Sequence, residues 1–260
     1  FRSVPLVPLA SPPSAAPAPP HPSPSPHTSP SSRSRISPLS DRRRPAASRY
    51  NRAMGRQILH DYPRRAHLEF YRRYPDPFYG VTFELEATNL RSRLRGAGRS
   101  TYAGLCWAFH RALLGIDAFR VRLEHDAVVL HDSLRIGVTV PAPRRTFSFT
   151  TLAWHPDPDV FFPAAAAAMA RASEQATLGD GDAPDYAYYT ALPRVPFLGF
   201  SHARLPDPTA GQPEIAFGKF REDSGRTFVP VGVQVNHLFV DGIDLGDLHD
   251  AAAESFQRGP

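Results

Sequence analysis

The chain has 260 residues, of which 42% are hydrophobic, so it can bury one sizeable core and has the ordinary size of a single domain. Residues 1–53 carry eight arginines and one aspartate, which leaves a net charge of −2 for residues 54–260 and excludes a basic nucleic-acid-binding body. The single cysteine, Cys106, excludes an intrachain disulfide, and no apolar run is long enough to span a membrane, so we expect a cytoplasmic protein.

Residues 1–53 have the composition of a disordered tail rich in Pro, Ser and Arg. They hold 13 of the 29 prolines and show neither a helical nor a strand-like apolar period. The first methionine is Met54, which suggests that the natural protein starts there and that the tail is translated upstream sequence. A transit peptide is the alternative, but the prolines oppose the amphipathic helix of such peptides. Residues 54–260 are expected to form one domain.

After Met54, segments with a helical period alternate with segments of strand-like period. Helices are predicted at residues 64–74, 100–115, 161–176 and 245–258. Strands are predicted at residues 81–90, within 121–140 and at 228–239. The third helix is expected to begin near Pro163, because proline is tolerated in a first helical turn. Together these elements predict an α/β fold, a two-layer sandwich in which helices pack a mixed β-sheet.

The strongest local signal is His237 followed by Asp241 and Gly242, at the end of the valine-rich strand. The spacing His-x-x-x-Asp is uninformative alone, and it occurs again at His155 and Asp159, a proline-broken segment that we interpret as surface. Only the copy at His237 has a trailing glycine, a preceding strand and a following helix.

The chemistry suited to His237 is proton removal from an attacking hydroxyl near neutral pH. Asp241 could orient the imidazole, supply a counter-charge or anchor the loop through an arginine. The structural alternative is a satisfied core histidine beside a turn-forming Asp-Gly pair. The residues alone leave these interpretations open.

The stretch VPVGVQVNHLFVDGIDLGDLHDAAAESF resembles the signature of chloramphenicol acetyltransferases, in which a strand ending in Gln-Val-His-His precedes three residues, Asp-Gly and a helix. Further likenesses follow in family order. They are YPRRAHLEF (62–70), FYGVTFELEATNLRSRL (78–94), STYAGLCWAFHRALLGIDAFRVRL (100–123), PRVPFLGF (193–200) and AFGKF (216–220). The resemblance covers most of residues 60–258 and implies the fold of coenzyme A-dependent acyltransferases.

By position, the resemblance implies that His237 is the general base and that Asp241 pairs with Arg64 to hold the active-site loop. It places Lys219 and Phe220 near the coenzyme. It assigns the acceptor pocket to Phe70, Tyr71 and Tyr79. In this family acetyl-coenzyme A is a co-substrate, no cofactor is permanently bound, and the acceptor hydroxyl attacks it directly. The family also implies a homotrimer whose sites lie between subunits.

The sequence departs from the family pattern at three positions. Gly199 stands where the family has the serine that stabilises the oxyanion, and it is counted with the acceptor site. Ala216 replaces a threonine, and Asn236 replaces the first histidine of the pair. Loss of an oxyanion donor costs roughly a hundredfold in rate unless another group replaces it, and a backbone N–H, a water or Ser201 could take that role.

These departures leave two functional hypotheses. One is acetyl transfer to a hydroxyl of a small molecule, with chloramphenicol as a possible acceptor. The other is a non-catalytic or weakly active homologue that binds a small amphipathic ligand.

Other charged clusters are expected to be solvated surface. Asp180, Asp182 and Asp185 lack the spacing of a calcium loop, and we predict no metal site. The basic run at residues 41–52 sits on the expected tail, so no nucleic-acid or membrane partner is predicted.

Overall fold

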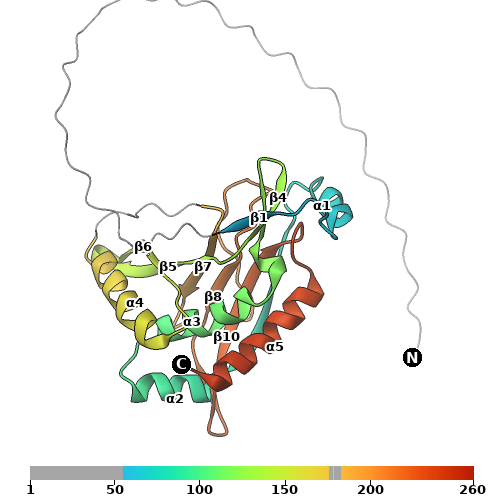
Figure 1. Ribbon diagram of the computed structural model, residues 1–260. Coiled ribbons are helices and arrows are strands. Elements are labelled where there is room, and N and C mark those ends of the chain that lie inside the picture. Colours follow the sequence, from blue (N-terminus) through green and yellow to red (C-terminus); the bar gives the residue numbers. More distant parts are fainter. Residues whose placement is uncertain (1–54, 176–177, 179–182) are drawn as a thin grey trace, which may run out of the picture. The chain divides into compact units, whose positions relative to one another are not determined.

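A mixed β-sheet of seven strands organises the computed structural model, which describes residues 55–175, 178 and 183–260. The strand order is β2-β10-β8-β7-β5-β6, with β9 paired to β10 (Figure 1). Strands β5, β7 and β8 are parallel neighbours, and the other pairs are antiparallel. The strands are β2 (Phe78–Glu86), β5 (Arg135–Ala142), β6 (Thr146–Leu152), β7 (Tyr186–Ala191), β8 (Glu214–Phe217), β9 (Arg221–Asp223) and β10 (Arg226–Asn236).

Strand β10 places the site because it lies between β2 and β8 and ends next to His237. Its alternating valines Val229, Val231, Val233 and Val235 are each at most 2% exposed, as the period of the sequence predicts. They pack into the core with the helices, so the alternate residues of β10 face the opposite side of the sheet.

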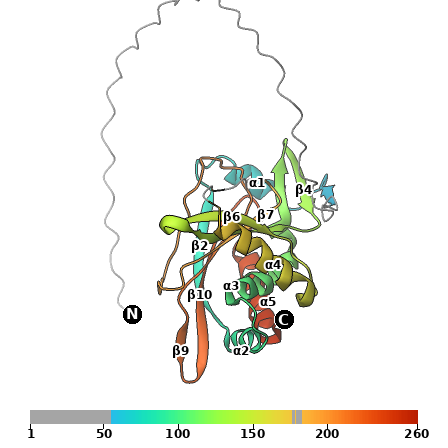
Figure 2. The ribbon, with the colours of Figure 1, turned by 90° about the vertical axis from the view of Figure 1, so that its left-hand side faces the viewer.

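Four helices line one side of the sheet, as Figures 1 and 2 show. They are α2 (Thr88–Gly96), α3 (Thr101–Leu114), α4 (Pro158–Ser173) and α5 (Gly242–Arg258). The short α1 (Arg65–Tyr71) lies at the end of the sheet where β10 finishes, since its Tyr71 contacts His237. The predicted α/β sandwich with a mixed sheet is confirmed. No helix of the described ranges is long and apolar enough to cross a membrane.

A second, three-stranded antiparallel sheet has the order β1-β4-β3. Its strands are β1 (Arg56–Ile58), β3 (Val121–Glu124) and β4 (Ala127–His131). Short 3₁₀ turns, η1 (Asp117–Arg120) and η2 (Pro143–Arg145), precede β3 and β6. The expected tail and the suggested start at Met54 lie outside the described residues.

Several predicted boundaries are wrong: β10 ends at Asn236 and not at 239, α5 begins at Gly242 and not at 245, and α1 ends at Tyr71 and not at 74. Helix α4 begins at Pro158, because the Asp157 side chain accepts a hydrogen bond from the backbone N–H of Asp159 and caps the helix there. Pro163 therefore lies inside the helix and not in its first turn. The strand predicted at 81–90 ends at Glu86, and Thr88 already belongs to α2.

The other face of β2 and β10 is partly covered by residues 192–213, which connect β7 to β8 and are called the outer segment here. Gly232 of β10 allows its close approach, because a Cβ there would lie 3.2 Å from the Cβ of Phe200. The outer segment thus lies directly on the strands.

Candidate active site

The turn after β10 holds His237 by hydrogen bonds on both sides of it. The backbone N–H of His237 donates to the Pro77 carbonyl at 3.0 Å, and that of Leu238 donates to the Asn236 side-chain oxygen at 2.9 Å. The Asn236 amide also donates to the carbonyls of Pro208 and Ala210. Asn236 is 1% exposed, so at the position of the family's first histidine it anchors the turn to the outer segment.

The imidazole of His237 lies between two tyrosine rings. Tyr71 is stacked on it with a centroid distance of 4.1 Å and an interplanar angle of 8°, and Tyr79 lies on it at 4.4 Å and 31°. The Nδ1 atom is buried without a hydrogen-bond partner among the described residues, whereas Nε2 is not enclosed in this way. The ring is therefore positioned by aromatic contacts and presents Nε2 outward.

Arg64 ties the turn to the start of α5. Its guanidinium donates to Asp241 at 2.8 Å, to Asp244 at 2.5 Å and to the carbonyl of Phe239 at 2.8 Å. Asp241 and Asp244 also form a capping box at the N-terminus of α5. The carboxylate of Asp241 is thus engaged with Arg64 and the helix, and it does not orient the imidazole.

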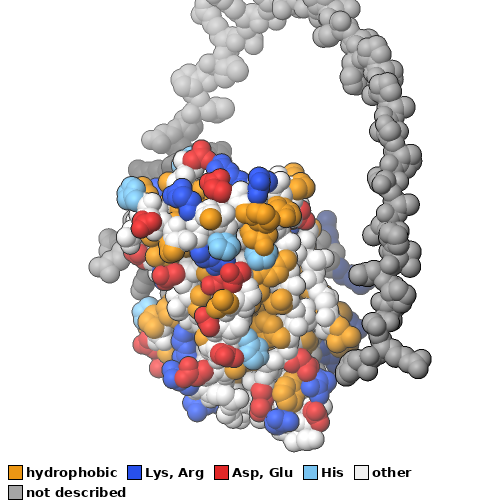
Figure 3. Space-filling model, turned by 90° about the vertical axis from the view of Figure 1, so that its right-hand side faces the viewer, with side chains coloured by type: hydrophobic (Ala, Val, Ile, Leu, Met, Phe, Trp, Pro, Cys, Tyr) orange, Lys and Arg blue, Asp and Glu red, His pale blue; other side chains and the backbone are white. Residues whose placement is uncertain are grey.

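The aromatic surface beside His237 continues to solvent. Phe70 is 44% exposed and Tyr74 45%, and both rings contact Tyr71. On the face shown in Figure 3, hydrophobic side chains gather beside histidine and acidic side chains. Burial raises the pKa of Tyr79, whose hydroxyl donates to the Val240 carbonyl at 3.3 Å, so it stays a neutral donor.

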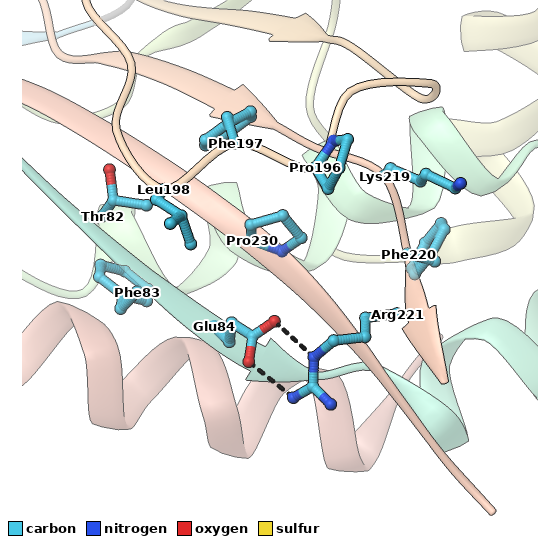
Figure 4. Close-up of a pocket in the computed structure, with 10 residues that line it drawn as sticks. All are labelled: Thr82, Phe83, Glu84, Pro196, Phe197, Leu198, Lys219, Phe220, Arg221 and Pro230. Atoms are coloured by element: carbon cyan, nitrogen blue, oxygen red, sulfur yellow. Dashed lines mark hydrogen bonds and ion pairs between the residues drawn. The ribbon is translucent and has the colours of Figure 1, made fainter. Parts of the chain in front are cut away.

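Lys219 and Phe220 lie apart from His237, at a cavity of about 480 Å³. The Glu84 and Arg221 side chains close one side of it with a two-point ion pair at 2.8 and 3.1 Å (Figure 4). Most of the remaining lining is apolar: Phe83, Pro196, Phe197, Leu198, Phe220 and Pro230, with Thr82 and the cation Lys219. Neither His237 nor the residues around it line this cavity.

Gly199 is exposed, and a Cβ there would meet nothing within 4 Å. It adjoins Leu198 of the cavity, but it offers only backbone groups. Ser201 is exposed and has no hydrogen-bond partner among the described residues. Ala216 is buried in β8. No described hydroxyl therefore stands at the two positions where the family carries one.

The structure brings six of the nine predicted site residues together: His237, Asp241, Arg64, Phe70, Tyr71 and Tyr79. Lys219 and Phe220 share the separate cavity, and Gly199 lies at its border. Sequence reasoning missed the anchoring role of Asn236 and a polar cluster around His202. No pattern in the sequence marks His202, and only its contacts in the structure distinguish it from the other histidines.

Two of the acidic residues predicted to lie on the surface form ion pairs with arginines. Asp159 pairs with Arg99 in the first turn of α4, with its side chain 81% exposed. Asp185 pairs with Arg135, whereas Asp180 and Asp182 lie outside the described residues. Within the described part of the chain, no group of three or more His, Cys, Asp or Glu side chains could hold a metal ion.

Comparison with known proteins identifies the family. The family described as chloramphenicol acetyltransferase matches residues 55–251. The chain belongs to this family. It is therefore a coenzyme A-dependent O-acetyltransferase, of a family that uses acetyl-coenzyme A as co-substrate.

Curated relatives include two chloramphenicol acetyltransferases. That of Streptomyces acrimycini is 29% identical over 198 residues, covering 73% of this chain and 88% of the relative. Chloramphenicol acetyltransferase 2 of Escherichia coli is 27% identical over 187 residues, covering 71% and 88%.

Solved structures agree on the fold. A chloramphenicol acetyltransferase superposes with a TM-score of 0.69 at 23% identity, covering 78% of this chain and all of the other. The dihydrolipoamide acetyltransferase of Azotobacter vinelandii gives 0.55 at 13% identity, covering 74% of this chain and 86% of the other. Both show the acyltransferase fold.

Proposed function

We propose that this protein transfers the acetyl group of acetyl-coenzyme A to a hydroxyl of a small-molecule acceptor, with His237 as general base. The observation that carries the proposal is the imidazole held between Tyr71 and Tyr79 with Nδ1 buried and Nε2 outward. An enclosed Nδ1 favours Nε2 as the atom that exchanges protons with a substrate. Because curated relatives are chloramphenicol acetyltransferases, chloramphenicol is the first acceptor to test.

In the proposed reaction, Nε2 of His237 removes the acceptor's hydroxyl proton while the oxygen attacks the thioester carbonyl. The tetrahedral intermediate collapses to the acetyl ester and expels the coenzyme A thiolate, which takes the proton back from the imidazolium. The two tyrosine faces stabilise the transient imidazolium through their π-electrons, typically by about 0.5–2 kcal/mol. Arg64 keeps the turn in place through Asp241 and Asp244.

The cavity bordered by Lys219 and Phe220 is the proposed coenzyme site. Its apolar walls suit the pantetheine arm, and the Lys219 ammonium suits a phosphate. We expect Lys219→Ala to raise the KM for acetyl-coenzyme A about fivefold at low ionic strength with little change in kcat, and Lys219→Arg to retain the wild-type KM. Steady-state kinetics at two salt concentrations check this, and an unchanged KM in the alanine variant would place the coenzyme elsewhere.

Within one chain, His237 lies apart from the cavity of Lys219 and Phe220, and this separation supports an active site shared between two copies of the chain. His237 does not line the coenzyme cavity of its own chain, so a second copy could supply that cavity, in keeping with the expected homotrimer. Mixing His237→Ala chains with Lys219→Ala chains tests this. Mixed oligomers that recover turnover at low acetyl-coenzyme A support a shared site, and recovery no greater than the average of the two parents opposes it.

A ligand-binding homologue without turnover is the second candidate, favoured by Gly199 and Ala216, which supply no hydroxyl. Thiol release from acetyl-coenzyme A with chloramphenicol and a panel of small alcohols separates the candidates. Turnover that His237→Ala abolishes without loss of coenzyme binding supports the acetyltransferase. Folded protein that binds acceptors but never releases thiol supports the binding homologue.

A further inference from the structure

A polar cluster lies on the outer face of the sheet, among residues to which the proposed reaction assigns no role. It joins His202 and Arg204 of the outer segment to Glu214 of β8 and Gln234 of β10. The side chains of His202, Arg204 and Glu214 are 18%, 17% and 16% exposed. Polar groups this far from water require partners, yet Nε of Arg204 is buried without one in the described part of the chain.

Hydrogen bonds fix the tautomer of His202. Its backbone N–H, which can only donate, lies 2.7 Å from a side-chain atom of Gln234, so that atom is the amide oxygen. The Nδ1 of the same histidine lies 3.2 Å from this oxygen and 3.4 Å from a carboxylate oxygen of Glu214. The amide oxygen can only accept, so Nδ1 carries the proton. The lone pair is therefore on Nε2.

The surroundings keep the imidazole neutral. Burial, with a smaller contribution from the nearby Arg204 guanidinium, lowers the pKa of His202 to about 4, although His202 donates a hydrogen bond to the Gln234 amide oxygen. Burial also raises the pKa of Glu214 to about 7, although Arg204 donates to it at 2.9 Å. At neutral pH the Nε2 of His202 is thus a hydrogen-bond acceptor and a poor base. Among the described residues it has no partner, and it is not enclosed.

The cluster adjoins the cavity described above. In the pairing of β10 with β2, Gln234 lies opposite Gly80, Gly232 opposite Thr82, and Pro230 opposite Glu84. Thr82 and Pro230 line the cavity. Gln234 is two residues beyond Gly232, the partner of Thr82, so the cluster lies roughly 7 Å further along the same face of the sheet. Phe200 lies between them, with its ring 4.6 Å from that of His202.

We propose that Nε2 of His202 accepts a hydrogen bond from a second hydroxyl or an amide N–H of the acceptor, and so determines which acceptors bind. This inference rests on the proposed function, because it takes the acceptor to bind beside the proposed coenzyme cavity, where the reacting thioester would lie. It assigns the two histidines different tasks. His237 takes a proton from the reacting hydroxyl, and His202 recognises a neighbouring donor without taking its proton.

Calorimetric titration of the full chain with chloramphenicol tests this without requiring turnover, because that molecule carries two hydroxyls and an amide N–H. We expect His202→Phe, which keeps a ring but loses the acceptor, to weaken binding about tenfold. His202→Gln retains an acceptor oxygen and should recover most of the affinity. Thermal unfolding of each variant checks that the outer segment still folds.

Equal affinities of the wild type and His202→Phe would overturn the proposal, as would a wild type that does not bind chloramphenicol. An equal loss in the phenylalanine and glutamine variants would reveal a merely structural role and overturn it too. A different outcome would contradict the proposed function without contradicting the role of His202. Binding that depends on His202 without thiol release would contradict acetyl transfer and leave the acceptor contact standing.

Discussion

His237, directly after β10, and His202, on the outer segment beside Gln234 of β10, are held by opposite means. His237 lies between two tyrosine rings, and its buried Nδ1 has no hydrogen-bond partner among the described residues. His202 lies in a polar pocket, with Nδ1 directed at Gln234 and Glu214. An aromatic enclosure fixes a ring without fixing its charge, which suits a group that gains and loses a proton. A polar pocket fixes the tautomer, which suits a group that recognises a hydrogen-bond donor of a ligand.

Among variants that leave both histidines in place, the largest effect is expected from Arg64→Ala. Arg64 holds the carbonyl of Phe239 and the carboxylates of Asp241 and Asp244, so its loss releases the turn that positions His237 and leaves two carboxylates without their cation. We expect kcat to fall about a hundredfold, the scale of a misplaced reacting group. Steady-state kinetics check this, with the exposed neighbour Arg65→Ala as the matched control. Comparable activities of the two variants would contradict an anchoring role.

A third histidine, His110, shows what full burial does. It is 0% exposed, and its ring nitrogens contact the Tyr189 hydroxyl at 2.9 Å and the Leu134 carbonyl at 3.0 Å. Burial lowers its pKa to about 4. The unfolded chain takes up a proton near pH 6.5 and the folded one only near 4. Its contribution to stability is therefore complete above pH 6.5 and is lost as the pH falls toward 4.

That contribution amounts to roughly 3 kcal/mol over the pH window. Urea unfolding at pH 7 and pH 4.5 measures it. We expect the free energy of unfolding to depend less on pH in His110→Asn than in the wild type, although the variant is less stable at pH 7. The exposed His155→Asn should keep the wild-type dependence, and equal pH slopes for all three proteins would contradict the assignment.

A smaller effect is expected from the aromatic enclosure itself. Tyr71→Leu keeps apolar bulk but removes the ring stacked on His237, so the imidazolium loses one stabilising face. We expect kcat to fall about tenfold with KM for the acceptor changed less. Tyr74→Leu is the matched control, because Tyr74 contacts Tyr71 but not the imidazole. If the two variants behave alike, the stacking has no catalytic role.

Sequence reasoning reached the fold because the valines of β10 and the cap of α3 are local signals. Ser100 caps α3 as predicted, its hydroxyl accepting from the N–H of Ala103. The start of α4 was misread because Asp157-Pro158 is a stronger start signal than Pro163. The grouping of Arg64 with Asp241 came from family resemblance, since contacts between residues so far apart leave no pattern in one sequence.

The cluster of His202 could not be predicted in the same way. Its members come from the outer segment, β8 and β10, and only the pairing of Gln234 with Glu214 in the sheet brings them together. The resemblance implies sites between subunits but gives no distances, so the separation of Lys219 from His237 within one chain is learned from the structure.

The most direct test of the account is rescue of His237→Ala by imidazole. The substitution leaves a ring-sized space between Tyr71 and Tyr79, which free imidazole fits. The account predicts that His237→Ala loses about a thousandfold or more in kcat, and that added imidazole restores part of it in a saturable manner. Near-wild-type turnover of the variant without imidazole would contradict the assignment of His237 as the base.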